Sequence, residues 1–168
     1  TEEVASEQRH TMSARKPVAG SIAFKGEGKE FGLPYAYANT LEGYELAGAE
    51  LKSPLPTTAS NIEAGAANFE LMCTHCHGLE GKGDGAISRN GHIMGIPDFS
   101  NKLKDLPEGN IYHTLMYGKG LMGSHASQIS QKGLWQIVQY VQVLQKGGQM
   151  PTFDSNGVAI VTETENND

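Results

Sequence analysis

Both cysteines of the chain lie in one short segment, residues 72–78, which reads Met-Cys-Thr-His-Cys-His-Gly. Cys73 and Cys76 are two residues apart, and His77 follows directly. A disulfide across so short a loop gains little loop-closure entropy and is usually strained. A thioredoxin-like redox pair needs a βαβ setting, and no strand-rich flank is present. These two alternatives are therefore the weaker ones.

Two further interpretations involve a bound group. A zinc site needs two more ligands at zinc spacing, and the other histidines do not supply that pattern. Covalent attachment of a c-type haem needs only Cys73, Cys76 and His77, with each thiol added across a vinyl group and His77 as the proximal iron ligand. The pattern favours haem attachment over zinc binding or dithiol chemistry.

The cysteines are expected to end a helix. Ser60 and Glu63 resemble a capping box, and Ile62 and Phe69 then fall on one helix face. Residues 78–85 contain four glycines in eight residues and cannot continue the helix. Such a run fits a close-packed loop over a flat cofactor edge, and it also fits a simple flexible loop.

Two more helices are predicted after this loop. One begins near Pro107 and ends at Gly118. The other carries an apolar stripe from Leu134 to Leu144 and stops at residues 147–148. Its other face holds four glutamines in place of charges, which fits either partial cover by another surface or ordinary solvation. These are Gln136, Gln139, Gln142 and Gln145.

The helices predict an all-α haem domain at residues 60–149, followed by a solvated tail at 150–168. Residues 1–59 are interrupted by prolines and glycines, yet are too apolar for a free linker. We interpret them as an extended, largely irregular docking arm that lies on a partner protein. Its large apolar residues are Phe24, Phe31, Leu33, Tyr35, Tyr37 and Tyr44.

An electron-carrying haem iron needs a second axial ligand from across the ring. Met122 lies in the irregular segment Gly118–Gly123, between the second and third helices, where a distal ligand fits. His125 is the main rival and would give a bis-histidine haem. The remaining candidates are less suitably placed: His92, Met94, His113 and Met116.

The proximal histidine also needs an acceptor for its second N–H group. Pro97 is placed to offer a backbone carbonyl to His77, and Phe99 could pack against the haem ring. A plain turn is the alternative for this segment.

Charge and hydropathy exclude other classes of function. The net charge is −6 without a basic stripe, which argues against nucleic-acid binding. No run of about 18 apolar residues is present. The chain begins Thr1-Glu2-Glu3, and no signal peptide is visible in these first residues.

These motifs resemble a class I cytochrome c. The haem segment, Pro97 and Met122 follow the order of that family, and the helix-packing residues recur as Gly65, Phe69, Cys73 and Tyr140. One departure is Gly123, where many relatives carry proline. The resemblance implies one covalent haem c with His77 and Met122 as iron ligands. It also implies electron transfer without catalytic residues.

Residues 15–23, 54–56, 118–128 and 135–141 resemble more narrowly the mono-haem cytochrome c subunit of bacterial alternative complex III. This resemblance implies a subunit of a quinol-oxidising respiratory complex with a multihaem cytochrome as electron donor. The acceptor would be a soluble cytochrome c or a terminal oxidase. It further implies the periplasmic face of the inner membrane and a lipid anchor on a cysteine upstream of Thr1. The alternatives are a free or lipid-anchored periplasmic cytochrome c, or a haem enzyme or sensor with an open distal site.

Overall fold

The computed structural model describes residues 18, 20 and 35–160. Within these residues the chain forms helices and isolated β-bridges but no strand, which confirms the predicted all-α class. No helix in the described part is both long and apolar enough to cross a membrane. The helices are α2 (Leu41–Glu50), α3 (Ala59–Met72), α4 (Thr74–His77), α5 (Ala86–Arg89), α6 (Glu108–Tyr117) and α7 (Gln131–Gln145).

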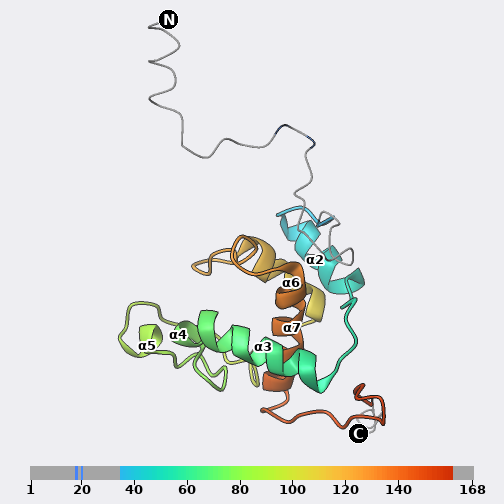
Figure 1. The fold of residues 1–168 in the computed structure, drawn as a ribbon. Helices are drawn as coiled ribbons and strands as arrows, with labels where there is room; N and C mark the ends of the chain where they lie inside the picture. The colour runs from blue at the N-terminus through green and yellow to red at the C-terminus, as the bar shows by residue number, and fades with distance from the viewer. Residues whose placement is uncertain (1–17, 19, 21–34, 161–168) are drawn as a thin grey trace, which may run out of the picture. The chain divides into compact units, whose positions relative to one another are not determined.

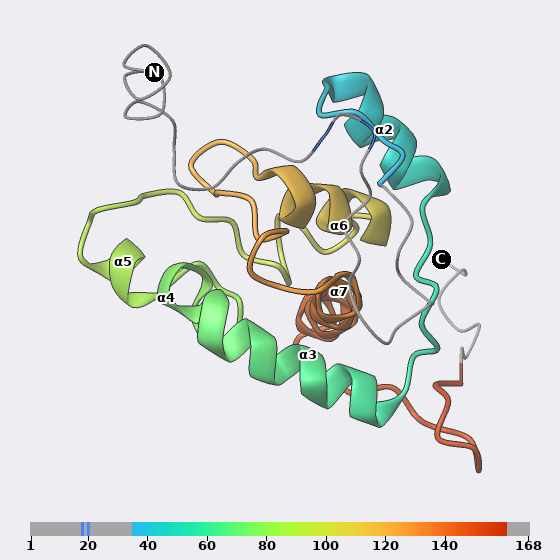
Figure 2. The same cartoon turned by 45° about the horizontal axis from the view of Figure 1, so that its top comes forward.

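The core lies where α3 crosses α7 (Figures 1 and 2). The helices approach closely because Gly65 of α3 faces the backbone of Gln136 in α7, and a β-carbon at residue 65 would meet that carbonyl. Large side chains fill the space around this crossing, and helix α6 packs on the other side of α7. The most deeply buried apolar side chains include Ile62, Phe69, Leu134, Ile137 and Val138.

The helix ends follow the sequence signals, with one correction. Helix α6 begins after Pro107 and ends at Gly118, whose φ of 83° only glycine adopts readily. The N-cap of helix α3 lies two residues earlier than predicted. Thr58, not Ser60, is the N-cap, and its hydroxyl accepts a hydrogen bond from the Asn61 amide at 3.2 Å.

The structure corrects the boundary of the N-terminal arm. Residues 36–59 belong to the same compact unit as residues 60–160, the described part that follows them. Helix α2 packs on α6 because small residues bring the backbones together: Gly109 of α6 faces the carbonyl of Ala47 in α2. The docking prediction for residues 1–34 lies almost wholly outside the described residues.

Of the two interpretations of the glutamine face of α7, the structure shows partial cover for Gln139 and Gln145. Gln139 is 2% exposed, and its amide donates to the carbonyls of Leu55 and Pro56 at 3.2 and 3.4 Å. Gln145 donates to the carbonyls of Leu103 and Leu106 at 2.6 and 3.0 Å. The surface that covers these glutamines is therefore the chain itself.

The described part of the C-terminal segment, up to residue 160, pairs with an earlier part of the chain. Val158 forms a β-bridge with Thr58, and the Ala159 amide donates to the Thr57 carbonyl at 2.7 Å. The first part of the predicted tail therefore pairs with the residues that lead into α3. The rest, 161–168, lies outside the described residues.

Candidate functional site

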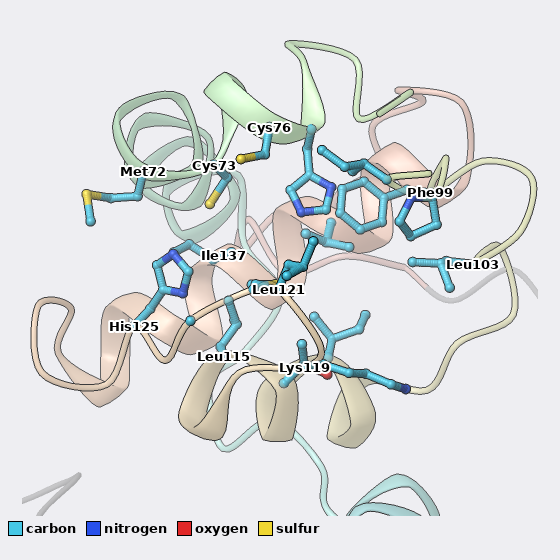
Figure 3. A pocket seen from close by; sticks show the side chains of 18 of the residues that line it. Met72, Cys73, Cys76, Phe99, Leu103, Leu115, Lys119, Leu121, His125 and Ile137 are labelled. Carbon is cyan, nitrogen blue, oxygen red and sulfur yellow. The ribbon is translucent and has the colours of Figure 1, made fainter. Parts of the chain in front are cut away.

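One apolar pocket gathers all the predicted site residues. Its volume is about 680 Å³, which lies in the range of ligand-binding cavities. Figure 3 shows Cys73, Cys76, Phe99 and His125 around it, with Lys119 on the other side of the view from the two cysteines. The predicted residues that line it are Cys73, Cys76, His77, Pro97, Phe99 and Met122.

The end of α3 and the short helix α4 position the two thiols and the histidine. Cys73 caps α3, and Cys76 and His77 lie in the single turn of α4. Both cysteines are free, and no group of three or more His, Cys, Asp or Glu side chains in the described part could hold a metal ion. The disulfide and zinc alternatives therefore find no support in the described residues.

Burial sets the protonation of this cluster. It raises the pKa of Cys73 to about 12, with a smaller contribution from Cys76. It also lowers the pKa of His77 to about 4, with a smaller contribution from His125. His77 is therefore neutral at pH 7, which is the form that binds a metal.

Phe99 fixes the orientation of the His77 ring. The two rings stack at a centroid distance of 4.8 Å and an angle of 19°. Phe99 is 8% exposed and also packs edge-on against Phe69 at 6.2 Å. That Phe99 packs against a haem ring stays a prediction. Its contact with His77, the predicted proximal ligand, is direct.

The glycine-rich segment Gly78–Gly85 is a close-packed loop. The Gly83 amide donates to the His77 carbonyl at 2.8 Å, and Gly81 accepts from the Phe99 amide at 3.0 Å. A β-carbon at Gly81 would meet the Phe99 ring, and one at Gly83 would meet the carbonyl of Ile96. Both glycines have positive φ. Of the two sequence interpretations, the structure shows the packed one.

The predicted hydrogen bond from His77 to Pro97 is not formed. His77 Nδ1 is buried and has no hydrogen-bond partner among the described residues, although Pro97 lines the same pocket. A buried unpaired ring nitrogen is costly unless a bound group satisfies it.

On the opposite side, Met122 and His125 both line the pocket. Met122 lies in a tight turn in which Lys119 and Met122 exchange two backbone hydrogen bonds of 2.9 and 3.0 Å. His125 Nδ1 is buried and unpaired within the described residues. Met94 also lines the pocket but is 84% exposed. The other three candidates, His92, His113 and Met116, are not among the lining residues.

These features fit a haem. The pocket is apolar, two free thiols lie beside a neutral histidine, and two buried ring nitrogens lack partners in the described part of the chain. Cys73, Cys76 and His77 would hold the group on one side and Met122 or His125 on the other.

Two further lining residues, Tyr44 and Lys119, were not predicted as site residues from the sequence. The Lys119 ammonium lies over the Tyr44 ring, 3.9 Å from its centroid. Tyr44 belongs to α2, which the sequence assigned to the arm, so only the fold brings it to the pocket. A threonine cap before an apolar segment at Thr40 is the signal that could have identified this helix.

Comparison with known proteins supports the same conclusion. Residues 60–141, just under half of the chain, match the family model described as cytochrome c oxidase, cbb3-type, subunit III. A comparison with curated proteins finds no match.

A solved structure, the reducing HAO-like protein complex of Kuenenia stuttgartiensis, is 26% identical with a TM-score of 0.49. The similarity covers 56% of this chain and 48% of that chain, so the match spans about half of the relative's length. A cytochrome c domain implies a covalently bound c-type haem and haem-mediated electron transfer. Residues 60–141 therefore resemble a c-type cytochrome domain.

Proposed function

We propose that this chain carries one haem c, bound through Cys73 and Cys76, with His77 and Met122 as axial ligands. The observation that carries the proposal is the convergence of both thiols, the neutral His77 and Met122 on one apolar pocket. When bound there, the haem would supply one-electron redox chemistry at its iron.

The residues of the chain hold and insulate this group. Phe99 keeps the His77 ring in one orientation, and the packed loop Gly78–Gly85 supports that side of the pocket. Phe69 and Ile137 exclude water from the pocket floor, because each is at most 2% exposed. Burial of this kind is one of the ways in which a protein sets a haem potential.

We place the second axial ligand at Met122 rather than His125. Met122 sits at the turn of a short loop that is anchored at both ends on α6: the Gly118 amide donates to Thr114 at 2.7 Å, and the His125 amide donates to Leu115 at 2.9 Å. The sequence order after the haem motif also matches that of the class I family. His125 remains the alternative that the experiment must exclude.

We further propose that the chain is a subunit of a membrane-bound, quinol-oxidising complex of the alternative complex III type. Support comes from the sequence resemblance of residues 15–23, 54–56, 118–128 and 135–141. The proposal includes a multihaem cytochrome as donor, and a soluble cytochrome c or terminal oxidase as acceptor. It also includes a position on the periplasmic face of the inner membrane through a lipid anchor upstream of Thr1.

Haem staining after denaturing electrophoresis and acid–acetone extraction tests the attachment. The expected result is a stained band in the wild type that the double variant Cys73→Ala/Cys76→Ala lacks. Haem that is extracted from the wild type would overturn the covalent attachment.

Absorption spectra of the oxidised protein test the distal ligand. We expect the weak far-red band of a sulfur–iron bond in the wild type and in Met94→Leu, and its loss in Met122→Leu. Met94 is a matched control because it is a methionine at the same pocket, yet is 84% exposed. A wild-type spectrum of the bis-histidine type, lost in His125→Ala, would move the ligand to His125.

Native purification from the source membrane tests the complex. Copurification with a multihaem cytochrome and other membrane subunits is expected. A chain that is isolated alone from the soluble periplasmic fraction would favour the free carrier.

A further inference from the structure

The segment Gly118–Gly123, here called the distal loop, has little packing of its own. Leu121 at its tip is 81% exposed, and a β-carbon at Gly120 or Gly123 would meet nothing within 4 Å. Its Leu121 and Met122 side chains line the pocket, and its Lys119 side chain contacts helix α2: the ammonium lies 3.9 Å from the centroid of the Tyr44 ring. That contact joins the loop to helix α2.

Tyr44 is itself held firmly. Its carbonyl accepts a hydrogen bond from the Asn110 amide group at 2.7 Å, and Asn110 is 7% exposed. Its ring packs edge-on against His113 at 5.6 Å. Gly48 lies so close to Asn110 that a β-carbon would meet its side-chain amide, so the register of α2 on α6 is fixed.

A second link ties the segment ahead of α2 to the end of α6. The Tyr117 hydroxyl donates to the Tyr37 carbonyl at 2.9 Å. Tyr117 is the last residue of α6, and the distal loop starts directly after it. Residues 37–48 therefore hold both the origin of the loop and its lysine.

We infer that Tyr44 is a positioning residue that holds the distal loop through Lys119 and so keeps Met122 at the haem. The inference rests on the proposed function in assigning Met122 as a ligand. Within the loop, Lys119 and Met122 exchange two backbone hydrogen bonds, so displacement of Lys119 displaces Met122. Residues 37–48 then help to hold Met122 in position, and this role does not depend on residues 1–34.

The test compares Tyr44→Leu, Tyr44→Phe and Lys119→Met in the haem-bound, full-length chain. Hydrogen exchange of the Met122 amide reports the opening of the loop, because this amide donates to the Lys119 carbonyl. The rate of carbon monoxide binding to the reduced protein reports release of the distal ligand. Leu46→Ala serves as control, since Leu46 lies on the same helix and is 45% exposed.

We expect Tyr44→Leu and Lys119→Met each to raise both rates about two- to fivefold, the scale of one cation–π contact near the surface. Tyr44→Phe keeps the ring and should stay near the wild-type rates. The double variant Tyr44→Leu/Lys119→Met should raise the two rates no further than either single variant does, because both substitutions remove the same contact.

Unchanged rates in Lys119→Met would overturn the inference, and so would a Tyr44→Phe variant that behaves like Tyr44→Leu. Lys119→Met keeps the test decisive if Tyr44→Leu disturbs α2. Failure of the proposed function is distinguishable: haem staining would be absent or His125 would prove to be the ligand, while exchange at the Met122 amide would still report the Tyr44–Lys119 contact.

Discussion

The two sides of the pocket are built differently. On the His77 side, ring stacking with Phe99 and the packed loop Gly78–Gly85 leave little free space. On the Met122 side, the distal loop is a short exposed turn held by backbone hydrogen bonds and one contact to α2. The comparison teaches that the His77 side of the pocket is set by dense local packing, and the Met122 side by a contact with a helix distant in the sequence.

The largest expected difference is in the free energy of unfolding, between the variants Phe99→Ala and Leu121→Ala. Phe99 is 8% exposed and contacts both His77 and Phe69, so its truncation should lower the free energy of unfolding by about 3–5 kcal/mol. Leu121 also lines the pocket but is 81% exposed, so its truncation should lower that energy by less than about 1 kcal/mol. Denaturant unfolding of the haem-bound variants measures both. Equal effects would mean that the two sides are packed alike.

The sequence predicts the His77 side well, because its information is local. Cys73, Cys76 and His77 are adjacent, the glycines that permit close packing follow at once, and the stripes of α3 and α7 contain large apolar residues. The ends of α6 at Pro107 and Gly118 follow from backbone restrictions on single residues. On this side the hydrogen bond predicted between His77 and Pro97 is absent, since His77 Nδ1 has no partner among the described residues.

The support of the Met122 side could not be predicted from such patterns. Helix α2 buries only small residues, Gly43, Ala47 and Gly48, while Leu41 and Leu46 are exposed. It therefore lacks an apolar stripe, and its stability comes from close backbone packing on α6. Gln139 illustrates the same limit: the sequence left cover and solvation both open, and only the fold brings its amide to the carbonyls of Leu55 and Pro56.

A pair of glycine substitutions probes the same contrast with a smaller effect. Gly83 has φ of 76°, and a β-carbon there would meet the backbone carbonyl of Ile96. Gly83→Ala should therefore lower the free energy of unfolding by about 1–3 kcal/mol. Gly123 has open space around it and no positive φ, so Gly123→Ala should be close to neutral. Thermal melting of the haem-bound proteins distinguishes them, and a strongly destabilised Gly123→Ala would show that the distal loop is packed more tightly than described.

The smallest expected effect concerns pH and the α2 contact. Burial lowers the pKa of His113, and the positive charge of Lys119 lowers it further. His113 is 3% exposed and packs against Tyr44 and Tyr117 at 5.6 and 5.0 Å. The unfolded chain therefore binds a proton at a higher pH than the folded chain does. The folding stability that depends on neutral His113 is therefore fully present above the ordinary pKa of about 6.5, and it declines as the pH falls below that value.

The melting temperature of the haem-bound wild type should thus drop between pH 7.5 and 5.5, and His113→Gln should flatten that slope. Lys119→Met should reduce the slope in part, because it removes the second cause of the lowered pKa. A His113→Gln variant with the wild-type slope would show that His113 does not link protonation to the packing of α2 on α6.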